Sequence, residues 1–289
     1  MVVRLSAFYK YGEKLEPKTE EEIHAGESVQ PEEDTALKMP LSNFFVEITS
    51  LTMFTLRFFK ELFLPPYEIN EFIKQSVNIG YRSVALVGIT GFIIGLVLTI
   101  QSRPTLAKFG AESLLAAMVA VSIVREIGPV ITALIVAGKV GSGIGAELSS
   151  MKVTEQIDAM QVSWTNPFKY LVVTRVLAAT LMLPLLVIFS DAIGIFGAFV
   201  GVNLKGDVSA NLFITQVFQS LEFKDLMPAI VKTFFFGFAI GLIGCYKGYN
   251  AENGTEGVGK AANSAVVFAS LVVFIIDMVA VQITSLLQY

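Results

Sequence analysis

The chain has 289 residues, of which 54% are hydrophobic and only 16% are charged, and its mean hydropathy is +0.65. Because soluble domains carry about 25% charged residues, this composition indicates an all-α polytopic membrane protein with little room for a soluble domain. The single histidine, His24, the single cysteine, Cys245, and a net charge of −4 without a basic patch exclude histidine-rich metal sites, an internal disulfide and a nucleic-acid partner; we expect no metal and no cofactor in this chain.

Residues 1–40 are polar and rich in acidic side chains, with almost no apolar periodicity. This pattern predicts a disordered cytoplasmic tail, with a binding element for a partner as the alternative. The segment lacks the apolar core of a cleavable signal peptide. We therefore expect the first membrane span to direct insertion.

Residues 41–66 differ from the tail because apolar side chains recur at helical spacing while charged ones lie on the opposite side, with Phe54 as an exception. This pattern predicts an amphipathic helix in the membrane interface. Pro65 and Pro66 end it. The apolar positions are Phe44, Phe45, Ile48, Leu51, Thr55, Phe58, Phe59 and Leu62.

A predominantly apolar region follows over residues 79–289, with five segments long enough to cross a bilayer. A spanning helix needs about 20 residues. The second segment exceeds that length, and an alternative interpretation breaks it into a re-entrant hairpin at Gly128 and Pro129, which gives an even number of spans. The expected spans are residues 83–102, 113–146, 172–204, 226–246 and 261–287.

The second span carries Arg125 and Glu126 between two uncharged stretches, residues 113–124 and 127–138. An ionisable side chain at the centre of a bilayer costs at least about 2.5 kcal/mol. We therefore expect the pair to face away from lipid, and it marks a candidate functional site.

Other charged residues within the expected spans are candidate partners of this pair, namely Asp191, Lys232 and Asp277. Because buried charges require partners, we predict a network in which Glu126 contacts Lys232 and Arg125 contacts Asp277. One interpretation is that these pairs fix the register of the helices. The other is that they exchange partners when the helices move relative to one another.

Lysine and arginine residues near the span ends set the expected orientation. More of them lie on the side of the predicted amphipathic helix than on the other, so that side should be cytoplasmic. Five spans then place the C-terminus on the opposite side of the membrane. Small residues spaced four apart, as in Gly91/Gly95 and Gly237/Gly241, allow close helix contacts, either within the chain or in a homodimer.

The longest polar interruption on the cytoplasmic side is residues 147–166. Its periodicity predicts a short amphipathic helix over residues 147–161, which suits docking against a soluble partner; a solvated loop is the alternative. The candidate docking residues are Glu147, Met151, Thr154, Glu155, Gln156 and Asp158.

Residues 122–160 read SIVREIGPVITALIVAGKVGSGIGAELSSMKVTEQIDAM, and this stretch closely resembles the MlaE/YrbE permease family of ABC transporters that work with MCE-domain proteins. The likeness extends to residues 183–186, to residues 248–261 and to the region of Asp277. The resemblance implies an interfacial helix followed by five spans, a homodimer in the bacterial inner membrane, and residues 147–161 as the coupling helix to a cytoplasmic ATPase. It also implies phospholipid as cargo and an MCE protein on the periplasmic side.

The resemblance further implies a lipid cavity between two protomers near the periplasmic side. The resemblance assigns Leu98, Gln101, Leu106 and Phe109 to the lining of this cavity. The alternative is that these residues serve only in ordinary helix packing. The chain lacks a G-x-x-x-x-G-K-[ST] loop, so a separate subunit must bind ATP.

Three other functions remain open at this point. A proton-coupled secondary transporter would use Arg125, Glu126 and Asp277 as a relay, although no inverted repeat is evident. An intramembrane enzyme would have to rely on Asp191 and Asp277, because no histidine lies in a span. A structural scaffold would leave the charges within the spans as register devices only.

Overall fold

The computed structural model describes residues 40–204 and 208–287, and over these residues it is helical without strands. The tail predicted over residues 1–40 lies, apart from Pro40, outside the described residues. The chain divides into two compact units, Met1–Ser50 and Leu51–Tyr289. Of the first unit, the described part is the beginning of helix α2 (Pro40–Leu62).

Five helical segments of the second unit are long and apolar enough to cross a membrane, as the sequence predicted. All five are longer than expected, and the first begins at Ile69 instead of Ser83. It extends further because Glu71 and Gln75, polar residues outside the expected span, are buried and hydrogen-bonded to each other at 2.7 Å. The segments are Ile69–Lys108, Glu112–Val153, Phe168–Asn203, Phe223–Tyr249 and Thr255–Leu286.

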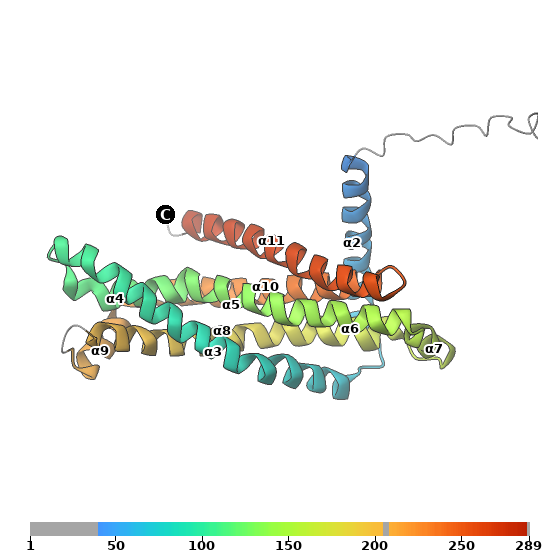
Figure 1. Ribbon diagram of the computed structural model, residues 1–289, viewed down its shortest axis with the longest axis horizontal. Helices are drawn as coiled ribbons and strands as arrows, with labels where there is room; N and C mark the ends of the chain where they lie inside the picture. Colours follow the sequence, from blue (N-terminus) through green and yellow to red (C-terminus); the bar gives the residue numbers. More distant parts are fainter. Residues whose placement is uncertain (1–39, 205–207, 288–289) are drawn as a thin grey trace, which may run out of the picture. The chain divides into compact units, whose positions relative to one another are not determined.

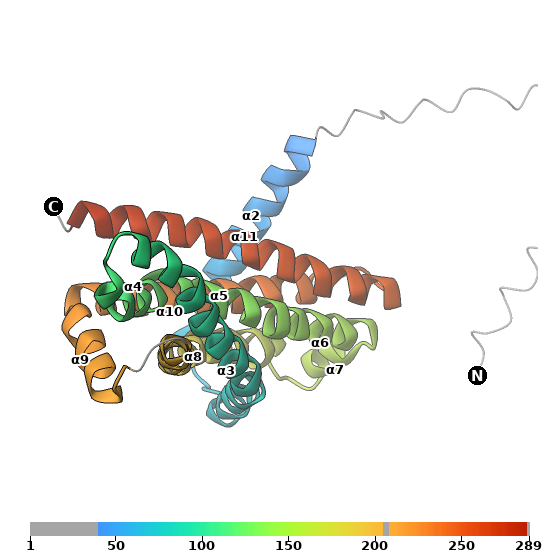
Figure 2. The same ribbon diagram turned by 60° about the vertical axis from the view of Figure 1, so that its left-hand side comes forward.

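The spans lie side by side along the long axis of the bundle (Figure 1). Helix α3 (Ile69–Lys108) packs along α8 (Thr174–Asn203), α8 packs along α10 (Phe223–Tyr249), and α10 packs along α11 (Thr255–Leu287) and α6 (Ser142–Val153). The view in Figure 2 shows the same neighbours. The hydrophobic core lies where these helices meet, with Phe168, Phe236 and Leu183 fully enclosed.

The second span is one continuous helical segment that passes through Gly128 and Pro129, so the re-entrant hairpin is wrong. It consists of η1 (Glu112–Leu114), α4 (Leu115–Ser122), the π-helix η2 (Ile123–Ile127), α5 (Gly128–Val136), the π-helix η3 (Ala137–Gly141) and α6. Pro129 has no N–H to give to the preceding turn, and the wider turn of η2 accommodates that loss directly before it.

Small residues let the spans approach closely within the chain. A side chain at Gly95 would overlap the backbone of Gly194 on α8, and one at Gly237 would meet the backbone of Ala179 and Thr180. The small-residue positions Gly91/Gly95 and Gly237/Gly241 are therefore occupied by intramolecular contacts.

Within the second unit, α2 packs Phe54 and Phe58 against the bundle, and the Phe54 ring lies 4.9 Å from the ring of Phe168. Phe54 was the apparent exception to the predicted apolar face, whereas Phe59, which was assigned to that face, is exposed. Arg57, on the charged side of the predicted helix, also reaches the bundle, and its guanidinium carbon lies over the Phe168 ring, 4.3 Å from the ring centre.

Two short helices complete the bundle. Helix α7 (Gln156–Val162) lies at the end where α6 finishes, and α9 (Ala210–Ser220) lies at the opposite end (Figure 1). The sequence analysis did not predict α9, whose Ser209 side chain caps it by accepting a bond from Leu212 N at 3.3 Å. Phe213 and Val217 of α9 are buried beside Phe199.

Candidate functional site: a charge cluster and an exposed helix

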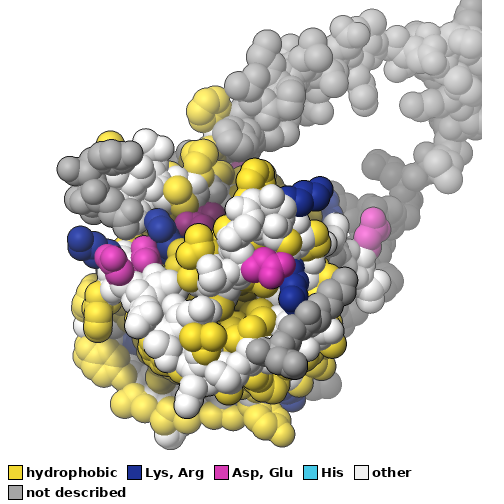
Figure 3. Space-filling view, turned by 90° about the vertical axis from the view of Figure 1, so that its left-hand side faces the viewer, with side chains coloured by type: hydrophobic (Ala, Val, Ile, Leu, Met, Phe, Trp, Pro, Cys, Tyr) yellow, Lys and Arg dark blue, Asp and Glu magenta, His cyan; other side chains and the backbone are white. Residues whose placement is uncertain are grey.

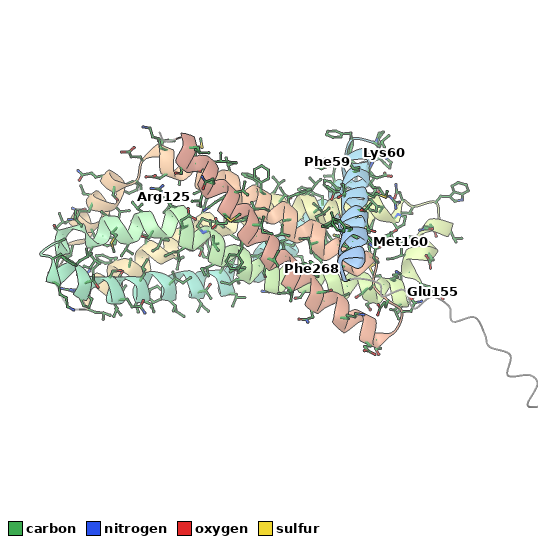
Figure 4. The ribbon with its side chains drawn as sticks, turned by 90° about the horizontal axis from the view of Figure 1, so that it is seen from above. Phe59, Lys60, Arg125, Glu155, Met160 and Phe268 are labelled. Atoms are coloured by element: carbon green, nitrogen blue, oxygen red, sulfur yellow. The ribbon has the colours of Figure 1, made fainter. Side chains whose placement is uncertain are left out.

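The π-helix η2 holds Arg125 and Glu126 within the second span. A π-turn inserts one extra residue into an α-helix, and such turns are frequent at functional sites. Both side chains reach α10 from this turn: Glu126 contacts Lys232, and Arg125 contacts Asp225. Figure 4 shows Arg125 on its helix, far from the end of the bundle that carries Glu155 and Met160.

Lys232 lies at the centre of the cluster. Its Nζ donates to Glu126 Oε2 at 2.6 Å and to Asp277 Oδ1 at 2.9 Å, and its side chain is 5% exposed. One ammonium group therefore joins three spans through two carboxylates. The Glu126–Lys232 contact is the one predicted from the sequence.

The predicted contact between Arg125 and Asp277 is wrong. Arg125 Nη1 lies 3.3 Å from Asp225 Oδ1 at the start of α10, while Asp277 is engaged by Lys232. Asp225 was overlooked because it falls just before the expected fourth span. Its spacing was informative: Asp225 precedes Lys232 by two helical turns, which places both on one face of α10.

Asp191 was predicted to belong to the network; it lies near enough to Lys232 for an electrostatic interaction but forms no ion pair among the described residues. Its Oδ1 is buried without a hydrogen-bond partner in the described part of the chain, and it packs against Gly128 directly after η2. Gly128 is required there because a Cβ would overlap the Asp191 carboxylate. Asp191 therefore supports the turn that carries Arg125 and Glu126 without pairing with either.

Two adjoining cavities open beside the cluster between α10 and α11. The first has a volume of about 380 Å³ and contains the charged groups. The second has a volume of about 910 Å³, shares Lys224, Asp225 and Lys232 with the first, and adds apolar side chains such as Phe235 and Ile283. Figure 3 shows acidic and basic side chains among apolar ones on this end of the molecule.

The four residues predicted to line a lipid cavity lie elsewhere in this single chain. Leu98 and Leu106 pack against the small core around Phe213, and Gln101 and Phe109 are exposed. None of them lines either of the two cavities beside the cluster. Their role at an interface between two protomers stays a prediction.

The helix predicted over residues 147–161 is divided in two, which corrects its bounds. Residues 147–153 complete α6, and α7 begins at Gln156 after Glu155, which has a positive φ of 58°. A single left-handed residue leaves the apolar period almost unchanged, so the sequence pattern did not reveal the break.

The candidate docking residues fall on both parts. Glu147 binds the buried Arg175 at 2.8 Å, and Met151 packs against the core, so both serve the bundle. Thr154 and Glu155 form the break, while Gln156 and Asp158 begin α7. Figure 4 shows Glu155 and Met160 at this end of the molecule.

Helix α7 has one buried side chain, Ile157, that anchors it to the core. At its other end the Trp164 side chain is 98% exposed, and the residue has a positive φ of 60°. Val162 is also exposed. Left-handed residues other than glycine are strained, so the backbone on both sides of α7 is held in costly conformations to present an apolar tip.

Comparison with known proteins agrees with this architecture. Residues 72–283 match the family model described as Permease MlaE. A Rickettsia felis protein named probable ABC transporter permease protein is 40% identical over 232 residues, which cover 80% of this chain and 90% of that protein. A Synechocystis protein of the same description is 36% identical over 70% of this chain and 77% of its own length.

A further relative is the intermembrane phospholipid transport system permease protein MlaE of Haemophilus influenzae. It is 36% identical over 213 residues, which cover 73% of this chain and 81% of that protein. The matched region contains all five membrane-length helices except their outermost residues, together with the charge cluster and α7. The chain therefore belongs to the MlaE permease family.

Proposed function

We propose that this chain is the membrane subunit of an ABC transporter that moves phospholipid or a related lipid. The observation that carries the proposal is the family match over residues 72–283, joined to a relative whose name assigns it to intermembrane phospholipid transport. In this proposal the chain works as a homodimer in the bacterial inner membrane and exchanges lipid with an MCE-domain protein in the periplasm.

A separate cytoplasmic ATPase supplies the energy, because the sequence lacks a phosphate-binding loop of its own. Helix α7 is the element we assign to that contact. Val162, the last residue of α7, and Trp164, just beyond it, are exposed apolar side chains next to a helix anchored by Ile157, and aromatic residues are frequent anchors at protein interfaces. The excess of basic residues at the span ends on the α7 side supports a cytoplasmic placement, with the C-terminus in the periplasm.

The charge cluster is the element that we assign to the conformational cycle. Lys232 bridges Glu126 and Asp277 on two different helices, so a small rotation of one span relative to another would shift Lys232 from both carboxylates to one of them. Such a shift keeps the ammonium paired throughout, which matters because an unpaired buried charge is expensive. The cavities beside it, part charged and part apolar, suit a head group and acyl chains.

The test is affinity purification in mild detergent. We expect an ATPase and extractable phospholipid to copurify with the chain. Substitution of the exposed residues Val162→Glu and Trp164→Glu should release the ATPase without loss of the membrane protein. The matched control is Phe218→Glu on α9, which is also exposed but lies at the opposite end of the bundle, and which should retain the ATPase. A chain purified without ATPase and without lipid would contradict the proposal.

A proton-coupled secondary transporter is the alternative that the cluster itself favours, because two carboxylates share one ammonium group. Reconstituted vesicles separate the two mechanisms. Transport that stops when ATP is depleted and survives an uncoupler supports the ABC mechanism. The opposite result supports the proton relay.

A further inference from the structure

A third cavity lies at the α7 end of the bundle, far from the charge cluster along the long axis of the bundle. It is a groove of about 220 Å³ between α8 and the segment that joins α2 to α3. Its walls are almost entirely apolar, and it opens among the exposed side chains Ile69 and Leu181. The lining residues include Leu62, Tyr67, Glu68, Phe72, Lys169 and Leu177.

Lys169 is the unusual residue of this groove. Its side chain is 5% exposed, and its Nζ has no hydrogen-bond acceptor among the described residues. It is held in the π-helix η4 (Phe168–Val173), and such turns are frequent at functional sites. A buried ammonium without a counter-charge is strongly disfavoured, so an anionic group from outside the described residues is needed beside it.

The carboxylates of the neighbourhood do not fill that role. Glu71 is engaged by Lys74 at 3.4 Å, Gln75 at 2.7 Å and Tyr170 at 3.1 Å. Glu68 lines the same groove but forms no hydrogen bond or ion pair with Lys169 in the described structure. The groove therefore has a buried cation on its wall and a separate carboxylate at its edge.

Tyr67 covers the ammonium group. The Nζ of Lys169 lies 5.4 Å from the centre of the Tyr67 ring, and Tyr67 is 63% exposed. A cation–π contact of this kind stabilises an ammonium group only partly. Because a lysine has a long flexible stem and Tyr67 faces outward, a rotamer change of either side chain brings the ammonium to the open groove.

We infer that a glycerophospholipid of the membrane leaflet on the α7 side occupies this groove, with its phosphodiester beside Lys169. One acyl chain lies along Leu177, Leu181 and Phe72, and the rest of the lipid remains in the bilayer. Glu68 faces the head group, which selects a lipid that carries an ammonium group, such as phosphatidylethanolamine, over one with a net negative head group. This lipid is a resident of the bundle and is independent of any cargo at the charge cluster.

The experiment is native mass spectrometry of the delipidated protein, with phosphatidylethanolamine or phosphatidylglycerol added back singly and without ATP or partner proteins. The variant Lys169→Gln should bind phosphatidylethanolamine about tenfold more weakly, the effect of one charge-assisted hydrogen bond. Lys169→Arg should restore binding. The matched control is Lys74→Gln, because Lys74 is also a cation on the α7 side but its side chain is 74% exposed; its binding should stay within about twofold of the unchanged protein.

Equal binding by the unchanged protein and Lys169→Gln would overturn the inference, and so would an equal loss in Lys74→Gln, which is the behaviour of a boundary lipid. Glu68→Gln should shift the preference toward phosphatidylglycerol, and an unchanged preference would overturn the head-group assignment. Lys169→Gln removes an unpaired buried charge and should fold at least as well as the unchanged protein, which its unfolding temperature in detergent will verify.

A photo-crosslinking residue locates the lipid. A crosslinking residue at Leu177, which lines the groove, should form a crosslink with lipid in the unchanged protein, and this crosslink should disappear in Lys169→Gln. A crosslinking residue at Phe235, which lines the cavity beside the charge cluster, should give the same amount of lipid crosslink in both Lys169 variants as in the unchanged protein. Loss at both positions would overturn a separate site. Because no step requires transport, failure here and failure of the proposed function give different results.

Discussion

Arg175 of α8 donates from Nη2 to Glu147 Oε1 of α6 at 2.8 Å, and the arginine side chain is only 2% exposed. A second donor of the same guanidinium, Nη1, bonds Leu171 O at 3.0 Å. This pair ties the second span to the third at the α7 end of the bundle. The spacing of the sequence did not indicate it, because Glu147 was assigned to a docking helix.

The first prediction concerns this pair. Glu147→Gln leaves the buried guanidinium without its counter-charge, and breaking a buried pair costs about 3 kcal/mol, at the low end of the usual range because Glu147 is half-exposed. We expect a lower free energy of unfolding in detergent. The double variant Glu147→Leu with Arg175→Met should recover much of the loss, and a double variant as unstable as Glu147→Gln would contradict this account.

The second prediction concerns the charge cluster. Glu126→Gln removes one of the two carboxylates that bind Lys232, while Asp277 still pairs with it. If partner exchange drives the cycle, we expect lipid transport to fall about thirtyfold, from roughly 2 kcal/mol of lost charge-assisted bonding, with little change in the amount of inserted protein. Transport and the amount of inserted protein will be measured on the same samples. If the pair only fixes the register of the helices, transport and the amount of inserted protein should fall together.

The third prediction concerns Gly128. A Cβ at this position would overlap the Asp191 carboxylate, so Gly128→Ala should lower the free energy of unfolding by roughly 1–3 kcal/mol, the usual cost of overpacking. Asp191→Ala removes the overlapping atoms and should restore most of the stability in the double variant. A double-mutant cycle by thermal unfolding measures the coupling, and additive effects would refute the proposed contact.

The fourth prediction concerns the joint before α7. Glu155 has a φ of 58°, a conformation that costs residues with a side chain about 1–2 kcal/mol. Glu155→Gly should raise the unfolding temperature, whereas the β-branched Glu155→Val should lower it. Asp158→Ala, inside α7 with ordinary helical geometry, is the control. A destabilised Glu155→Gly protein would show that the glutamate side chain matters more than the strain.

The sequence by itself determined the features that depend on composition and period. Five spans follow from the apolar runs because a bilayer requires a fixed length of apolar helix, and the special status of Arg125 and Glu126 follows from the cost of charge in hydrocarbon. The Glu126–Lys232 contact was also predictable, because few partners of opposite charge lie within the spans. The resemblance of residues 122–160 to one permease family could be recognised without the fold, because it lies in one continuous stretch of sequence.

Which polar groups contact one another depends on how the helices pack. Arg125 binds Asp225 because the π-turn directs it to the start of α10 while Lys232 binds Asp277, and Asp191 packs on Gly128 and forms no ion pair with another described residue. The break at Glu155, the burial of Phe54 and the burial of Lys169 likewise leave no mark on the periodicity of the sequence. The physical reason is that period records which face of a helix is apolar, whereas the rotation of neighbouring helices and a single inserted or left-handed residue set where each polar group points.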